Sequence, residues 1–180
     1  MFRFGKSKRT DDKALRSGTV DRVCSRMCAI PADPDACRDR STLWGRLHDT
    51  DELTFGQTHL APFTVTYKGL EYSFNTADVD YETDEDDPTL VALNDSEREF
   101  VLHADYALGL EMMFADNNMD SYHLQIKLLN MLVPDTVALI DNNAYRTYSG
   151  RWVRMTADSK VAPSPDYMYT IHAVSDSDDS

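Results

Sequence analysis

The sequence has little of the material from which several classes of protein are built. Of its 180 residues, only three are cysteines (Cys24, Cys28 and Cys37) and only seven are glycines. An odd number of cysteines, in a chain whose first residues lack the apolar stretch of an export signal, argues against a disulfide scaffold and for free thiols. No run approaches the roughly 20 apolar residues that span a bilayer. We therefore expect a cytoplasmic location and no membrane partner.

The familiar catalytic and cofactor-binding motifs are missing as well. The sequence contains no G-x-S-x-G, G-x-x-x-x-G-K-[ST], G-x-G-x-x-G or H-E-x-x-H. The acidic run Asp78–Asp87 fails as an EF-hand loop, because Thr83 and Thr89 stand where glycine and glutamate are needed. On a strand, Cys24 and Cys28 lie about 13 Å apart, too far to share a zinc ion. No metal and no cofactor is predicted, and cation binding by the acidic run stays open.

Charge is distributed unevenly along the chain. Residues 1–26 hold eight of the eighteen lysines and arginines and three aspartates, a local charge of +5, which leaves −18 for the rest because the whole chain carries −13. We expect a basic disordered arm at 1–20, a single domain at 21–174 and an acidic mobile tail at 175–180. An acidic body repels phosphate backbones, so nucleic acid is not expected as a partner. This charge favours a basic protein partner instead.

The middle of the chain changes from a strand pattern to a helix pattern within a few residues. Alternating apolar residues from Tyr106 to Phe114 predict a strand, and apolar residues at three-to-four spacing in 121–133 predict a helix that stops at Pro134. Thr136–Ile140 follows as a short strand of β-branched and apolar residues. These three elements form one predicted βαβ unit.

The segment Phe63–Phe74 is the clearest hairpin, with a turn at Lys68-Gly69. Pairing about that turn puts six apolar residues on one buried face, as the opposed pairs Tyr67 with Leu70, Val65 with Tyr72, and Phe63 with Phe74.

The remaining elements complete an α+β fold. We expect strands at Val23–Ile30 and Tyr167–Val174, a helix at Asp33–His48, and an exposed loop at Asp78–Asp87. Glu97–His103 is either a helix or the approach to the next strand. The order of elements predicts a mostly antiparallel sheet with helices packed on one face, containing one βαβ unit.

Two candidate binding residues lie on the helix 121–133. Gln125 projects among leucines, where a buried amide needs hydrogen-bond partners, supplied either by a strand or loop backbone or by a ligand. His123 lies in the polar wedge of the helix with Lys127 one turn away, which disfavours protonation of the ring and binding of a cation. A surface position is the favoured reading of His123.

Three further candidates lie near the ends of strands. His172 belongs to the predicted last strand, and Asp141 is both a turn former and a carboxylate available for acid/base chemistry. Trp152 either closes the core under a short helical turn or is exposed as a binding anchor.

Several of these residues also carry a resemblance to a known family. The run from Ser121 to Leu129, Val133-Pro134-Asp135, Ser149-Gly150-x-Trp152 and Pro163-x-Pro165-x-Tyr167 resemble bacterial uncharacterised proteins grouped as domain of unknown function 4026. The resemblance covers about residues 104–174. It implies no activity, cofactor or catalytic residue, and marks only positions that agree with the pattern: Ser121, His123, Gln125, Pro134, Asp141 and Trp152.

The leading functional hypothesis is a non-enzymatic protein-interaction domain, inhibitor-like or immunity-like, whose acidic surface suits a basic partner. The alternative is a small-ligand-binding or hydrolase domain that uses His123 or His172 with a carboxylate. A homo-oligomer, in which a second copy completes a sheet face, is a third hypothesis.

Overall fold

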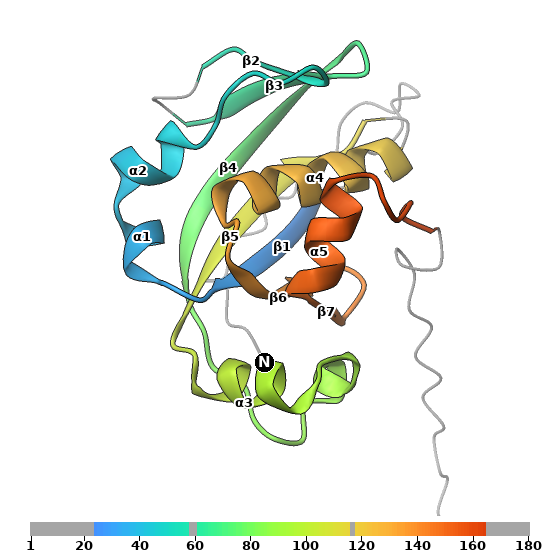
Figure 1. Cartoon of the computed structure of the whole chain (residues 1–180). Helices are drawn as coiled ribbons and strands as arrows, with labels where there is room; N and C mark the ends of the chain where they lie inside the picture. Colours follow the sequence, from blue (N-terminus) through green and yellow to red (C-terminus); the bar gives the residue numbers. More distant parts are fainter. Residues whose placement is uncertain (1–23, 58–60, 116–117, 165–180) are drawn as a thin grey trace, which may run out of the picture.

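A computed structural model describes residues 24–57, 61–115 and 118–164 (Figure 1). Within them one seven-stranded sheet contains β1 (Cys24–Pro31), β2 (Leu53–Phe55), β3 (Phe63–Tyr67), β4 (Leu70–Asp80), β5 (Tyr106–Met113), β6 (Thr136–Asp141) and β7 (Arg146–Ser149). The helical elements are α1 (Asp35–Arg38), α2 (Arg40–Gly45), the 3₁₀ helix η1 (Pro88–Ala92), α3 (Asp95–His103), α4 (Asn118–Leu132) and α5 (Gly150–Ala157).

The strands lie in the order β2-β3-β4-β5-β1-β6-β7, and every neighbouring pair is antiparallel. Because β5 and β6 both run antiparallel to β1, which lies between them, they are parallel to each other. Helix α4 connects them across the sheet, so the predicted βαβ unit is present with β1 as an inserted central strand. The α+β prediction with a mostly antiparallel sheet is confirmed.

The predicted hairpin has the predicted register. Tyr67 pairs with Leu70, Val65 with Tyr72, and Phe63 with Phe74. Lys68 and Gly69 both have positive φ, 50° and 79°, as the tight two-residue hairpin turn requires. Five of the six side chains are buried, whereas Leu70 is 45 % exposed because it lies at the turn.

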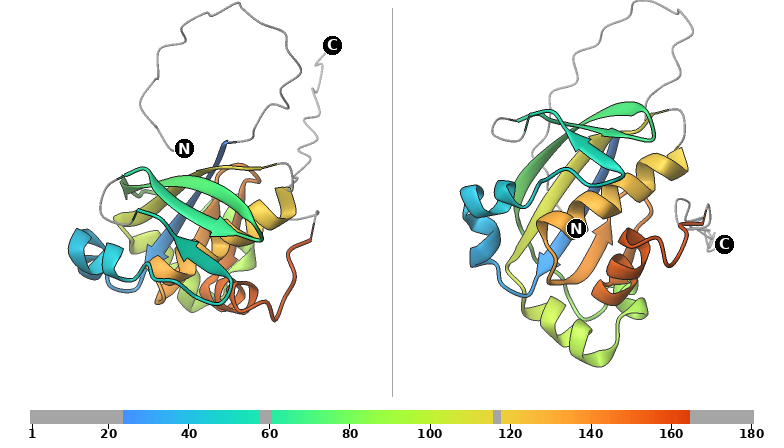
Figure 2. Two further views of the ribbon diagram at one scale, coloured as in Figure 1. Left: turned by 90° about the horizontal axis from the view of Figure 1, so that it is seen from above. Right: turned by 45° about the horizontal axis from the view of Figure 1, so that its top comes forward.

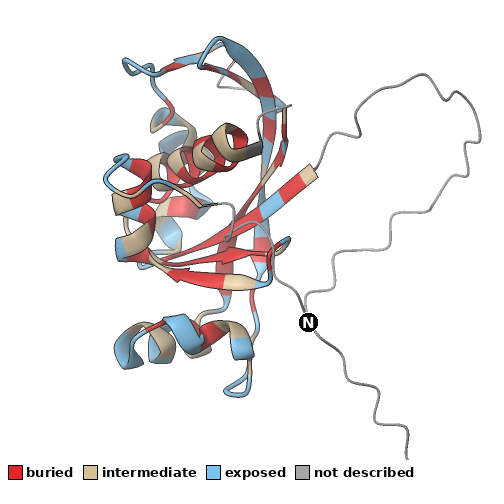
Figure 3. Cartoon of the chain, turned by 90° about the vertical axis from the view of Figure 1, so that its right-hand side faces the viewer, coloured by how far each residue is buried: buried red, intermediate tan, exposed pale blue. Residues whose placement is uncertain are grey.

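The sheet has a core on each face. The larger core lies beneath α4 and α5, which cross one face side by side (Figure 2). Strand β1 contributes Met27 and Ala29 to this core, whereas its residues Cys28 and Ile30 point to the opposite face. That second face is closed at one end by η1 and α3, which form a smaller core with β1 and β6. Helix α4 is largely buried, whereas α3 keeps many exposed residues (Figure 3).

Two predicted elements need correction. The helix expected at Asp33–His48 is two short helices, because Asp39 is extended (ψ 99°) and its carboxylate caps α2 by accepting from the Ser41 amide. The acidic run expected as a loop at Asp78–Asp87 begins instead inside β4, which continues to Asp80 and buries Val79.

The uncertain segment Glu97–His103 is helical, since α3 begins with a capping box between Asn94 and Glu97. The predicted basic arm, the last strand Tyr167–Val174 and the acidic tail lie outside the described residues.

Candidate functional site

The polar residues of α4 meet the C-terminal end of α5. One ring nitrogen of His123 lies 2.7 Å from the carbonyl oxygen of Thr156. Lys127 donates to the Ala157 carbonyl at 2.7 Å and forms an ion pair with Glu52 at 2.8 Å. The last carbonyls of a helix have no partner inside it and carry partial negative charge, so these contacts bind α4 to α5.

His123 is half-buried, and this burial is the main cause that lowers the pKa of its imidazole. The neighbouring charges of Lys127 and Lys68 lower the pKa further, whereas the bond to Thr156 raises it. The ring therefore favours its neutral form, and its bonded nitrogen is occupied by a backbone carbonyl. The sequence predicts His123 at the surface, whereas the structure places it at the contact between α4 and α5.

Gln125 is fully buried between α4 and the sheet, as the helix wheel predicts. Its amide nitrogen donates to two strand carbonyls, Leu110 of β5 at 3.0 Å and Ser25 of β1 at 3.2 Å. Its side-chain oxygen is buried without a hydrogen-bond partner within the described residues. Of the two partners considered for the buried amide, backbone or a ligand, the backbone of the strands is the one observed.

Asp141 and Trp152 are connected through two tyrosines. Asp141 is 1 % exposed, and its carboxylate accepts from the Asn143 and Ala144 amides at 2.9 and 3.0 Å. Burial is the main cause that raises the pKa of this carboxyl, opposed by those bonds and by one from Tyr122. The contacts continue from Tyr122 to Trp152. The hydroxyl oxygens of Tyr122 and Tyr148 are 3.3 Å apart, and Tyr148 stacks on Trp152 with ring centroids 4.1 Å apart.

Four of the five predicted site residues therefore lie in one seam between α4, α5 and the sheet: His123, Gln125, Asp141 and Trp152. The seam is filled by side chains bonded to one another and to backbone. It stabilises the packing of two helices. The fifth, His172, lies outside the described residues.

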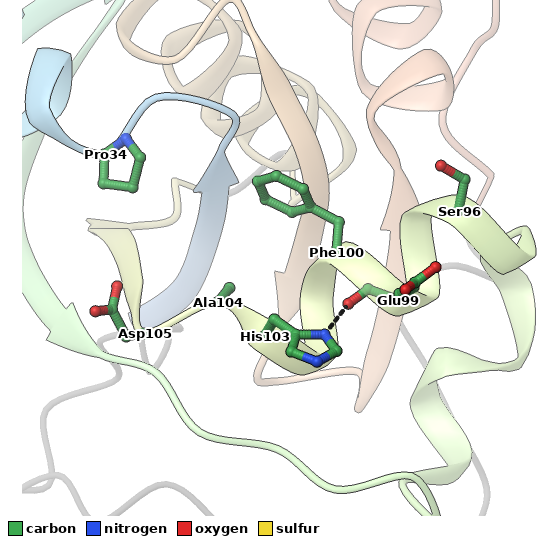
Figure 4. A pocket seen from close by; sticks show the side chains of 7 residues that line it. All are labelled: Pro34, Ser96, Glu99, Phe100, His103, Ala104 and Asp105. Atoms are coloured by element: carbon green, nitrogen blue, oxygen red, sulfur yellow. Dashed lines mark hydrogen bonds between the residues drawn. The ribbon is translucent and has the colours of Figure 1, made fainter.

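A hollow of about 420 Å³ lies elsewhere, between α3 and the turn from β1 into α1 (Figure 4). Its lining consists of Pro34, Ser96, Glu99, Phe100, His103, Ala104 and Asp105. Phe100 is 40 % exposed, so part of this large apolar side chain is available at the hollow. The His103 imidazole is fixed by a 2.8 Å bond to the Glu99 carbonyl.

The surroundings of the hollow are acidic. We call residues 78–105 the acidic segment, because its sequence holds eleven aspartates and glutamates and a single cation, Arg98. Arg38 of α1 lies beside the acidic segment, 4.0 Å from the Asp105 carboxylate. The Asp105 side chain is nevertheless 86 % exposed. The hollow could not be found from the sequence, because Pro34 and Phe100 are brought together only by the fold. The one available signal was a phenylalanine among acidic residues.

Two further hollows are smaller. One of about 140 Å³ lies on the second sheet face beside Arg26 and Gly109, and one of about 360 Å³ lies between Glu52, Lys127 and Asp158. His123 lines none of these three hollows. Across 24–57, 61–115 and 118–164, no three histidine, cysteine or carboxylate side chains gather as a metal ion would need. Every helix in the same residues is too short or too polar to span a bilayer.

The fold and these sites define a single-sheet α+β domain with an acidic hollow at one end. Residues 25–163 match the family described as "Protein of unknown function (DUF4026) N-terminal", and the chain belongs to this family. The predicted family resemblance is thereby confirmed: of the predicted stretch 104–174 the match covers residues 104–163, and it extends back to residue 25 in β1. Comparison with curated proteins and with solved structures found no match.

Proposed function

We propose that this domain is a non-enzymatic interaction module that binds a basic segment of another protein in the hollow between α3 and α1. The observation that carries the proposal is the half-exposed ring of Phe100 inside the acidic segment. An apolar side chain supplies contact area, and the surrounding carboxylates select the charge of the partner. Such a module acts as inhibitor or immunity proteins do, by covering a basic surface.

Charge supports the proposal through the rate of association as well as through contact. A surface of one sign raises the frequency of encounter with an oppositely charged partner, and salt weakens the effect. Phe100 then provides the salt-independent part of binding, because burial of apolar surface does not depend on screening.

The alternative, a small-ligand or hydrolase site on a histidine and a carboxylate, has less support. His123 binds a backbone carbonyl, and Glu52, a carboxylate whose charge raises the pKa of His123, is paired with Lys127. For His172 the alternative stays a prediction. The homo-oligomer also stays a prediction, tested by the mass of the protein in solution.

The experiment is capture from a lysate of the source cells by the immobilised full chain, at low and high salt. Phe100→Ser removes the ring from the hollow without disturbing a core. Val91→Ser is the matched control, because Val91 is an 84 % exposed apolar residue of η1 outside the hollow. We expect a basic protein that the wild type and V91S retain at low salt and that F100S loses. Equal capture by all three chains, or capture of no basic protein, contradicts the proposal.

A further inference from the structure

Arg38 places a guanidinium at the edge of the hollow. It ends the four-residue helix α1, and its side chain is half exposed. One terminal nitrogen lies 3.2 Å from the Asp35 carboxylate and the other 4.0 Å from Asp105. The central carbon of the guanidinium lies 4.8 Å from the centre of the Tyr106 ring. Arg38 therefore occupies one flank of a carboxylate that lines the hollow.

Neither ion pair holds Arg38 firmly. Asp35 and Asp105 have side chains 90 % and 86 % exposed, and exposed pairs contribute little because water and salt screen them. At 4.0 Å, the contact to Asp105 is also longer than a charge-assisted hydrogen bond. A guanidinium from outside with better geometry can therefore take the Asp105 carboxylate from Arg38.

We infer that the hollow recognises an arginine next to an apolar residue, and that Arg38 competes with that arginine for Asp105. The inference rests on the proposed function and specifies its partner. The apolar side chain of the partner lies on Phe100, and its guanidinium forms two parallel bonds to Asp105, as arginine does and lysine cannot. Arg38 then turns toward Asp35, which it already contacts.

The test uses fluorescence anisotropy with the full chain and a short fluorescein-labelled peptide in which phenylalanine and arginine alternate. Arg38→Gln removes the competitor and strengthens binding by about two- to fivefold, the range of an exposed ion pair. Asp105→Asn weakens binding, and the double variant R38Q/D105N shows no gain over D105N. A peptide with lysine in place of arginine binds more weakly.

Arg98→Gln is the matched control, since it removes one positive charge from the acidic segment at a residue whose contact is the Glu85 carbonyl. An equal gain from R38Q and R98Q reduces the effect to long-range charge and overturns the inference. A loss of affinity for the peptide in R38Q also overturns the inference. If F100S still abolishes binding in that case, the proposed function is unaffected. If F100S binds as the wild type does, the proposed function itself is overturned. Far-UV circular dichroism confirms that each variant is folded.

Discussion

Gln125→Leu tests whether the buried amide joins α4 to two strands. The substitution replaces the polar amide with an apolar side chain of similar size and removes both donated bonds, to Ser25 and Leu110. Leaving a buried acceptor unpaired costs about 1–3 kcal/mol, so two acceptors cost about 2–6 kcal/mol. The unpaired side-chain oxygen disappears at the same time, which returns about 1–3 kcal/mol. The expected net loss in the free energy of unfolding is about 1–3 kcal/mol.

Gln125→Glu adds a pH dependence with a definite sign. In this variant a carboxyl oxygen takes the place of the amide nitrogen that donates to the Ser25 and Leu110 carbonyls. Only the protonated carboxyl can donate to them, so the pKa of the introduced glutamate rises in the folded state. The unfolded glutamate ionises above about pH 4.3. Relative to the wild type, the variant then loses up to about 1.4 kcal/mol per pH unit until the folded pKa is reached.

Urea unfolding followed by far-UV circular dichroism at about pH 5 and about pH 8 measures both variants against the wild type. We expect a loss in Q125L that does not change with pH and a loss in Q125E that grows between the two values. If Q125L stays within about 0.5 kcal/mol of the wild type and Q125E shows no pH dependence, the side chain faces water. Gln125 would then not join α4 to β1 and β5.

Three other outcomes are expected. Gly150→Ala should lower the melting temperature strongly, because an added Cβ would lie 1.8 Å from the Thr136 carbonyl oxygen; the control Gly45→Ala, with nothing within 4 Å, should not. Asp141→Asn should remain folded, since both amide bonds reach the one oxygen that asparagine retains. The raised pKa of Asp141 favours its protonated form in the folded state, so the contribution of Asp141 to the free energy of unfolding falls as pH rises above about 4. Over that range D141N should therefore gain stability relative to the wild type, measured by urea unfolding. Lys127→Met should lower the free energy of unfolding by about 1–3 kcal/mol, because it leaves Glu52 and the Ala157 carbonyl without their cation. An unchanged urea midpoint for K127M would contradict the contacts described between α4 and α5.

Elements governed by neighbouring residues could be predicted from the sequence. The hairpin register followed from alternation on both sides of Lys68-Gly69, and both residues have the positive φ that such a turn needs. The burial of Gln125 followed from the helix period, because the residues around it on the wheel are leucines.

Elements decided by distant contacts could not be predicted in this way. The helix at Asp33–His48 is interrupted at Asp39, which caps α2, and the next residue, Arg40, pairs with Asp78 of β4. Asp78 lies 38 residues further along the chain, so the sequence around the break does not show this contact. The hollow was missed for the same reason, since it forms only where α3 packs beside the turn after β1.

The candidate residues show a different limit. Polar residues on an otherwise apolar helix face point to function or to buried bonding, and the sequence alone does not separate the two. In His123 and Gln125 the bonding partners are backbone carbonyls of α5, β1 and β5. These partners become visible only once the helix has been placed on the sheet.

The hollow between α3 and α1 is proposed to bind a basic segment of another protein. Titration of the isotope-labelled full chain with the phenylalanine–arginine peptide, followed by amide chemical shifts in nuclear magnetic resonance, tests this binding most directly. The largest shifts are expected on Ser96, Glu99, Phe100, Ala104 and Asp105. Shifts concentrated on the seam of α4 and α5, or no shifts at saturating peptide, would exclude binding in the hollow.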